Sequence, residues 1–344
     1  MRVTLLPCLL SLALTAAPAP AFAADDLLQA FDSTFSKPAP HQLAQAHPAA
    51  PHPLSATTPL PAGFEAQLAA LANKAQGRIG VAAYDLTTGR SVGVLGEQPF
   101  PLASTGKVAI VATFLDGVDQ GRFHLTDQFP LMMPLPSRRF EGAIAPVRQG
   151  EMLPASTLIE LAITRSDNHA TDALLAAIGG PQAVDRWLAR AGIQGMRLDR
   201  DIATMVRDDG AVNPATTIDP RDSTTPQAMT KLLAGLYRGE WLSASSRAVL
   251  LGAMSRCRTG VHRIRALLPE EAMVGHKTGT LSNTSSDVGI IRTVDGHAVA
   301  VAIYVTGQGG KPARDSRIAT IARAVYENYH PERQQGTTAQ GASR

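Results

Sequence analysis

The sequence predicts an α+β fold with three layers (α/β/α), in which one antiparallel sheet is built from both ends of the folded region and an all-helical subdomain is inserted between them. Three observations predict it. Strand patterns occur near the start and near the end of the region, six helical patterns lie between them, and one further helical pattern flanks the strands at each end. We therefore expect one continuous unit and not two sequential domains.

Each element follows from a local pattern. Residues 64–75 have helical spacing of apolar residues, and residues 78–95 predict a hairpin that turns at Thr88-Gly89. The helical patterns of the middle section cover residues 106–119, 156–164, 170–178, 181–191, 226–238 and 243–254. Strand patterns return at 275–280, 287–294 and 297–306, with the hairpin dipeptide Asp295-Gly296 between the last two. An amphipathic helix over 314–329 closes the domain.

Composition excludes several classes of protein. The 344 residues are 44% hydrophobic and 18% charged, which is typical of a folded globular chain. Lys and Arg number 32 against 29 Asp and Glu, an excess of only +3 along the chain, so the basic surface of a dedicated nucleic-acid-binding protein is not expected. Two cysteines exclude a disulfide scaffold, and without an HExxH motif or paired Cys/His spacing we expect no metal and no cofactor.

The N-terminus has the pattern of a secretory signal peptide over residues 1–23. Arg2 precedes a short apolar run, and Ala21-Phe22-Ala23 provides an A-x-A cleavage site. The alternative, a transmembrane anchor, is disfavoured because the run is short and is interrupted by prolines. Residues 24–62 predict a Pro/Ala-rich linker, 63–330 the folded domain and 331–344 a polar tail. We expect a secreted or periplasmic protein without a stable membrane span, in which Cys257 is the one remaining cysteine.

Three polar clusters stand out. Ser104 and Lys107 form an S-x-x-K motif where the first central helix begins. One helical turn separates the two residues, so the amine can accept the hydroxyl proton if burial and nearby positive charge lower its pKa. By itself the motif is more typical of an N-cap serine followed by a solvated lysine. A phosphate-binding P-loop and a nucleophile elbow are both excluded, because the glycines that they require are absent here.

The other two clusters are Ser166-Asp167-Asn168 and Lys277-Thr278-Gly279. Alone, the first is an N-cap signature for the helix that follows, and the second is an ordinary strand with a glycine for close backbone approach. Together with S-x-x-K, however, S-D-N and K-T-G form the set that is typical of penicillin-interacting serine enzymes. The combination therefore predicts nucleophilic serine catalysis.

On these motifs the chain resembles the class A serine β-lactamase family and its penicillin-binding relatives, over about residues 64–329. The segments 166–172 and 220–226 support the resemblance. It implies a β-lactamase/transpeptidase-like fold and an acyl-enzyme formed on Ser104, with Lys107 as proton acceptor or relay. Ser166 would pass a proton to the leaving lactam nitrogen, and Asn168 would orient Lys107 and the acyl side-chain amide.

The resemblance also implies a substrate-binding strand. Lys277 would supply positive charge near Ser166 and the substrate carboxylate, and Thr278 would donate a hydrogen bond to that carboxylate. Gly279 completes the motif, and the backbone N–H groups of Ser104 and Thr280 would form the oxyanion hole.

The sequence departs from the family in the loop that activates the deacylating water, where the family has R-x-E-x-x-L-N. If Arg200 is the arginine, Asp201-Ile202 follows and the glutamate is missing. A register seven residues downstream has the pattern R-x-D-x-x-V-N and puts Arg207 fifteen residues before Asp222, the separation expected for the ion pair that closes the loop. We prefer this second register.

The preferred register predicts that Asp209 is the deacylation base and that Asn213 is its partner on the water. Aspartate is one methylene shorter than glutamate, a displacement large enough to weaken a catalytic contact. The alternative is that Asp208 and Asp209 are solvated turn residues before Gly210. For the substrate carboxylate we predict Arg263, which precedes Lys277 by fourteen residues, while Arg265 is the structural alternative.

The predicted function is that of an exported serine hydrolase that opens β-lactam antibiotics, with the roles in antibiotic resistance and β-lactam catabolism that such an activity implies. Its partner is a small-molecule β-lactam, and we expect a monomer. Two other functions share the acylation site: a D,D-peptidase or penicillin-binding enzyme that acts on cell-wall peptides, and a penicillin sensor that acylates once without turnover.

Overall fold

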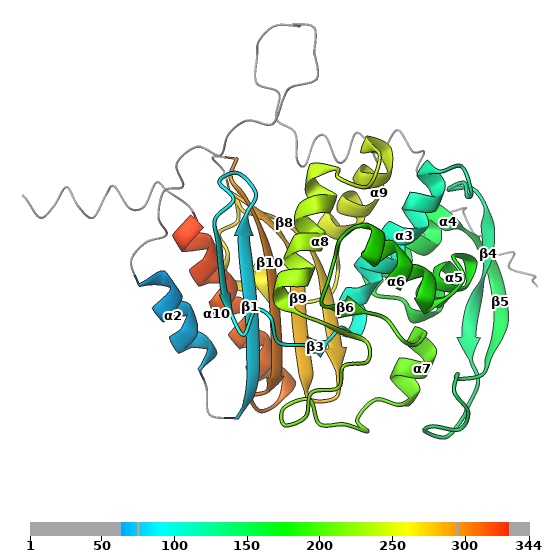
Figure 1. Cartoon of the computed structure of the whole chain (residues 1–344), viewed down its shortest axis with the longest axis horizontal. Coiled ribbons are helices and arrows are strands. Elements are labelled where there is room, and N and C mark those ends of the chain that lie inside the picture. Colours follow the sequence, from blue (N-terminus) through cyan, green and yellow to red (C-terminus); the bar gives the residue numbers. More distant parts are fainter. Residues whose placement is uncertain (1–62, 74–75, 294–295, 330–344) are drawn as a thin grey trace, which may run out of the picture.

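The computed structural model describes residues 63–73, 76–293 and 296–329 (Figure 1). The predicted signal peptide, linker and polar tail, together with the predicted turn residue Asp295, lie outside the described residues. No helix in these ranges is both long enough and apolar enough to cross a membrane.

A five-stranded antiparallel sheet forms the middle layer, in the order β2-β1-β10-β9-β8. The strands are β1 (Gly77–Asp85), β2 (Ser91–Val94), β8 (Met273–Leu281), β9 (Thr284–Arg292) and β10 (Ala298–Gly307). β1 pairs along its whole length with β10, from Gly77 opposite Gly307 to Asp85 opposite Val299. The two ends of the domain thus meet in one sheet, which confirms the predicted fold class.

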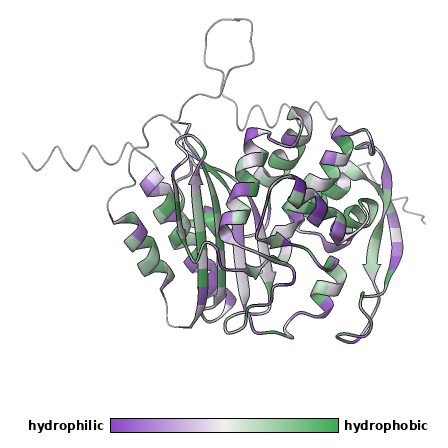
Figure 2. Ribbon diagram, in the orientation of Figure 1, coloured by the Kyte–Doolittle hydropathy of each residue, from purple (hydrophilic) through white to green (hydrophobic). Residues whose placement is uncertain are grey.

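Helices cover both faces of this sheet (Figure 1). One face packs against α2 (Phe64–Ala72) and α10 (Lys311–Tyr329), and the other against α8 (Pro226–Arg238) and the helical subdomain. Every residue of β10 is buried, because a strand covered on both faces has no solvent side. Figure 2 shows the resulting run of apolar residues along the central strands.

The helical subdomain is built around α3 (Lys107–Asp119), most of whose residues are buried. Residues 108–115 of α3 are all buried and are apolar apart from Thr113, as a helix segment buried on all sides has to be. Around it lie α4 (Ala155–Glu160), α5 (Asn168–Ala177), α6 (Pro181–Arg190) and α9 (Ala244–Ser255). These elements match the predicted helices to within a few residues at their ends.

Several features were not predicted, among them a small sheet of β3 (Phe100–Pro101), β7 (Ser223–Thr224) and β6 (Met196–Arg197). The helix expected over 156–164 ends as a π-helical turn, Leu161–Arg165. The strands β4 (Gln128–Pro134) and β5 (Val147–Pro154) form a separate hairpin, and α7 (Ile202–Arg207) is a short helix within the loop that precedes Asp222. Prolines and a largely exposed surface obscure the strand pattern of the hairpin, and six residues are too few to show helical periodicity.

Candidate active site

Ser104 lies in a tight turn of 3-10 helix, Ala103–Gly106, which leads directly into α3. Ala103 has φ = 46°, a left-handed conformation that is strained for a residue with a side chain. Hydrogen bonds hold the turn in place. The Leu102 amide donates to the Asp222 carbonyl at 2.8 Å, and the Thr105 hydroxyl donates to the Leu102 carbonyl at 2.6 Å. The half-buried Ser104 side chain is therefore presented from a rigid backbone.

The glycine of K-T-G lets strand β8 approach this turn. A Cβ at Gly279 would lie 2.4 Å from Ser286 Oγ and 3.1 Å from both Ala103 Cβ and Thr105 Cγ2. The two 3.1 Å separations are tighter than most real contacts, so a side chain at residue 279 would force β8 and the serine turn apart, and it would also clash with Ser286 of the neighbouring strand β9. The sequence interpretation of a close backbone approach is confirmed.

Lys107 is completely buried and its amine is surrounded by acceptors. Nζ donates to the Ser166 carbonyl at 2.7 Å, to Asn168 Oδ1 at 2.7 Å and to the Asp167 carbonyl at 3.2 Å, and it lies 3.4 Å from Ser166 Oγ. The first two motifs are thus brought together, 59 to 61 residues apart in the chain.

A change of helix type makes this arrangement possible. The π-helical turn ends at Ser166, which has φ = 59°, and Asp167 then caps α5 by accepting a hydrogen bond from the Ala170 amide at 2.8 Å. The left-handed Ser166 interrupts the helix, and its carbonyl accepts from Lys107, while the Asp167 carbonyl accepts from Lys107 as well as from the amide and hydroxyl of Thr171. π-Helical turns are frequent at functional sites.

Lys277, also completely buried, contacts Ser166 from the opposite element. Its Nζ donates to Ser166 Oγ at 2.9 Å and to the Thr278 carbonyl at 2.8 Å. The Ser166 hydroxyl therefore lies between two amines, one from α3 and one from β8. The structure places all three motifs in one network.

The two amines differ in their electrostatics. Burial and the charge of Lys277 lower the pKa of Lys107 well below its usual value, although Asp167 and Asp172 oppose the shift. Burial lowers the pKa of Lys277 to about 8. Near neutral pH the arrangement therefore favours a charged Lys277 beside a Lys107 that can give up its proton, and a neutral amine can accept a proton from a serine hydroxyl.

The loop before Asp222 follows the upstream register, which corrects the preferred prediction. Arg200 Nε is 2.5 Å from Asp222 Oδ2, and the Asp222 carboxylate also accepts from the amides of Asp199 and Arg200. Arg207 pairs instead with its neighbour Asp208 at 2.8 Å. The predicted Arg207–Asp222 ion pair is wrong, because the additional residues of the loop fold as α7 and carry Arg207 away.

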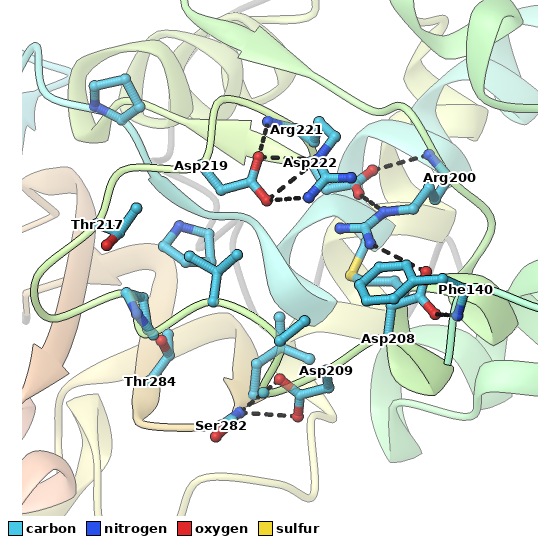
Figure 3. Close-up of a pocket in the computed structure, with 18 of the residues that line it drawn as sticks. Phe140, Arg200, Asp208, Asp209, Thr217, Asp219, Arg221, Asp222, Ser282 and Thr284 are labelled. Carbon is cyan, nitrogen blue, oxygen red and sulfur yellow. Dashed lines mark hydrogen bonds and ion pairs between the residues drawn. The ribbon is translucent and has the colours of Figure 1, made fainter. Parts of the chain in front are cut away.

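Asp209 and Asn213 both contact the turn between β8 and β9. Both carboxylate oxygens of Asp209 accept from the Ser282 amide at 2.9 Å, as Figure 3 shows. Asn213 Oδ1 accepts from Asn283 Nδ2 at 2.9 Å. The structure thus does not bring these two residues to the Lys107–Ser166 network, and their contacts are those of anchors that fasten the loop to the sheet.

One buried acid was missed in the sequence. Asp172 lies one turn after Asn168 on α5, and its carboxylate accepts from the amides of Ile202 at 2.7 Å and Ala203 at 2.8 Å. Burial raises its pKa to about 7, although the two backbone hydrogen bonds oppose that shift. The i, i+4 spacing from Asn168 was the available signal, since it puts both residues on one helix face. Asp172 fixes the start of α7 against α5.

Arg263 is also reassigned. Its side chain is only 2% exposed, and its guanidinium pairs with Asp315 at 2.8 Å. It donates to the carbonyls of Gly279 and Ser286 and, from Nη2, to Thr280 Oγ1 at 2.7 Å. The expectation that Arg263 itself projects toward the substrate is therefore replaced by a supporting role behind Thr280. Arg265 donates to backbone carbonyls of Ser255 and Val274, as its structural alternative anticipated.

The loop register makes a prediction about stability. Arg200→Ala should lower the free energy of unfolding by about 3 kcal/mol, because it leaves the Asp222 carboxylate buried without its cation. Arg207→Ala is the comparison and should lower it by less, because Asp208 keeps its contact with Arg200 and Arg207 loses only Asp208 and the carbonyls of Glu141 and Gly142. Urea unfolding of both variants tests this, and the reverse ranking would restore the downstream register.

Two buried amines around a serine hydroxyl, beside a second serine on a strained turn, are characteristic of serine enzymes that acylate themselves. In the described part of the chain, no group of three or more His, Cys, Asp or Glu side chains is arranged to hold a metal ion. Comparison with known proteins agrees with this class. The sequence model of the beta-lactamase enzyme family matches residues 63–329, and the chain belongs to that family.

Individual relatives are similar over most of their length. A beta-lactamase of Proteus vulgaris is 31% identical over 249 residues, covering 71% of this chain and 88% of the relative. Beta-lactamase CTX-M-97 of Escherichia coli is 31% identical over 269 residues, which cover 76% of this chain and 88% of the relative. Among solved structures, the class A beta-lactamase of the last common ancestor of Gram-negative bacteria has a TM-score of 0.66 at 37% identity, covering 78% of this chain and 100% of that one.

Proposed function

We propose that this protein is an exported serine β-lactam hydrolase that works through an acyl-enzyme on Ser104. The observation that carries the proposal is the buried network in which Lys107 and Lys277 both reach the Ser166 hydroxyl, next to the turn that holds Ser104. The family membership of the chain supports the reaction class. Export rests on the signal pattern of residues 1–23, and a monomer is proposed with it.

Acylation follows from the positions of the amines. Lys107 Nζ takes the proton of the Ser104 hydroxyl, and Ser104 Oγ forms a bond to the lactam carbonyl carbon. The amides of Ser104 and Thr280 stabilise the oxyanion. As the C–N bond breaks, Ser166 gives its proton to the lactam nitrogen. Ser166 then regains a proton from the ammonium group of Lys107, which had taken it from Ser104. Water then hydrolyses the ester and releases the opened product.

Substrate recognition uses the other polar groups of the site. The positive charge of Lys277 and the hydroxyl of Thr278 bind the carboxylate that penicillins and cephalosporins carry, and Thr280 is held beside them by Arg263. Asn168, whose Oδ1 faces Lys107, contributes its amide to the acyl side chain. No cofactor takes part in any of these steps.

One set of observations favours a second function, a penicillin-binding enzyme or sensor that deacylates slowly. With Arg200 paired to Asp222, the loop has Ile202 where the family pattern has its glutamate. Asp209 is not included in the mechanism, because its carboxylate accepts from the Ser282 amide. Under this alternative the acylation site is the same and only the fate of the ester differs.

Intact-protein mass spectrometry after mixing with a penicillin tests the proposal and separates the two functions. We expect the mass of one penicillin to be added once and then lost as the ester is hydrolysed. An adduct that persists for hours would favour the penicillin-binding alternative. Failure of any adduct to form would contradict both functions.

Lys277→Ala should raise KM for a penicillin by about ten- to a hundredfold, because the lactam carboxylate loses a charged hydrogen-bonding partner. The pKa of Lys277 makes the same contact pH-dependent: its positive charge is present below about pH 8 and is lost as the pH rises through that value. KM of the parent should therefore increase at alkaline pH. Steady-state kinetics against pH measure both effects, and a parent KM that is flat from neutral to alkaline pH would contradict this role of Lys277.

A further inference from the structure

A second line of polar side chains runs from the protein interior to Thr278. Cys257, which follows α9, is buried, and its Sγ lies 3.3 Å from Thr259 Oγ1. Thr259 Oγ1 in turn lies 2.6 Å from Thr278 Oγ1. A single hydroxyl thus connects the thiol to the residue that binds the substrate carboxylate in the proposed function.

The strands β8 and β9 also hold a buried acid–base pair. His276 and Asp287 are both fully buried, and His276 Nδ1 lies 2.8 Å from Asp287 Oδ1. Burial lowers the pKa of His276, but the charge and hydrogen bond of Asp287 outweigh it and raise that pKa. Burial likewise raises the pKa of the Cys257 thiol, but the charge of His276 and the hydrogen bond to Thr259 outweigh it and lower that pKa. Cys257 thus has a neighbour that stabilises its thiolate.

The state of the sulfur determines the direction of the two hydroxyls. Each threonine hydroxyl has one proton to donate. When Cys257 is a thiolate, Thr259 donates to the sulfur, and the 2.6 Å contact requires Thr278 to donate to Thr259. When Cys257 is a thiol, Thr259 is free to donate to Thr278, and the Thr278 proton is available to a ligand in the site.

We propose that Cys257, acting through Thr259, is a positioning residue that decides whether the Thr278 hydroxyl donates into the site or away from it, and thereby sets the affinity for the substrate carboxylate. The inference rests on the proposed function for the role of Thr278. It makes carboxylate binding stronger when the sulfur carries its proton.

Other charged groups surround the sulfur and have to be separated from its effect. His276 and Lys277 belong to β8 and Asp287 to β9, while Arg263 comes from the segment before the 3-10 helix Ile264–Leu267 and is paired with Asp315 of α10. Lys277 also loses charge at alkaline pH, and the thiolate raises the pKa of Lys277, so removing the thiolate weakens carboxylate binding through Lys277. Removing the thiolate also removes its repulsion of the substrate carboxylate, which acts in the opposite direction. Thr259→Val keeps the sulfur, so tighter binding by that variant has to come from Thr278.

The test compares the parent with Cys257→Ser and Thr259→Val. Serine at residue 257 does not ionise in this range, and valine at 259 removes the connecting hydroxyl while keeping the side-chain shape. The concentration dependence of Ser104 acylation by a penicillin is measured at about pH 6 and about pH 9, on either side of the lowered thiol pKa.

At the lower pH we expect all three proteins to have the same half-saturating concentration. At the higher pH both variants should have values about ten- to a hundredfold below that of the parent, the effect of one regained hydrogen bond to a charged group. The limiting rate of acylation should not change, because this contact is made equally in the bound substrate and in the transition state.

Two controls make the result specific. The methyl ester of the same penicillin has no anionic group, so parent and variants should bind it equally at both pH values. Thr259→Ser keeps the hydroxyl and should behave like the parent. If Cys257→Ser fails to fold, Thr259→Val alone decides the matter.

Equal half-saturation of parent and Thr259→Val at about pH 9, with normal acylation, would overturn the inference. Weaker binding by the variants at both pH values would do the same, since it would indicate a packing role only. Absence of acylation of the parent at either pH would contradict the proposed function instead, so the two failures are distinguishable.

Discussion

Ser104→Ala is expected to abolish the covalent penicillin adduct. In the proposed mechanism Ser104 Oγ is the atom that forms the bond to the lactam carbonyl, and the other hydroxyl near Lys107, that of Ser166, serves as the proton donor to the leaving nitrogen. Removing the nucleophile of a serine hydrolase costs about 10⁶-fold in rate. The adduct peak in intact-protein mass spectra should therefore fall to background over the whole time course.

The matched control is Ser245→Ala, which removes an exposed serine hydroxyl from α9. Its adduct should form and decay as in the parent. Melting temperatures of both variants should remain close to that of the parent, since Ser104 is only half-buried. Labelling of Ser104→Ala at the parent's rate would move the nucleophile elsewhere and refute the mechanism.

Ile202→Glu is expected to speed deacylation by about 10²–10⁴-fold, the range that a well-placed general base contributes. With Arg200 closing the loop, residue 202 is the position that carries glutamate in the family pattern, and Asp172 holds its backbone against the helix that bears Asn168. Residue 202 is buried in the apolar core at the start of α7, so a melting temperature first has to show that the variant folds. The lifetime of the acyl-enzyme, measured by mass spectrometry, should shorten accordingly.

Ile202→Gln is the control, because glutamine has the same shape without an ionisable carboxyl, and it should leave the lifetime unchanged. Asp209→Asn should also leave it unchanged, since the Asp209 carboxylate accepts from the Ser282 amide, which an asparagine oxygen also accepts. A long-lived acyl-enzyme in Asp209→Asn would reinstate Asp209 as the base. Unaltered deacylation in a folded Ile202→Glu variant would exclude residue 202 as the position of a base.

The local pattern of apolar and polar residues was sufficient to predict most of the fold. Apolar periodicity located the helices and the sheet strands to within a few residues, and strands at both ends of the domain implied their pairing, since β1 and β10 have few other partners. The three short motifs could be recognised in the sequence just as directly. Ser104 with Lys107 and Ser166 with Asn168 are each close in sequence, so one helix start or one turn positions each pair.

The loop shows where local pattern was insufficient. Arg207 has the expected separation from Asp222 and Arg200 does not, yet the folding of the intervening residues as α7 is what lets Arg200 reach Asp222. The same folding brings Asp209 to the Ser282 amide. A six-residue helix is stabilised by its packing and by the Asp201 cap, not by any periodicity that a sequence displays.

By itself the sequence determined the fold class and predicted Ser104 as the reactive serine, because these depend on residue types and short spacings. The tertiary structure alone decided which arginine closes the loop, that Arg263 is buried behind Thr280, and that Thr259 joins Cys257 to Thr278. Those contacts join residues on different elements, and side chains on separate elements find their partners only when packing fixes the distance between them.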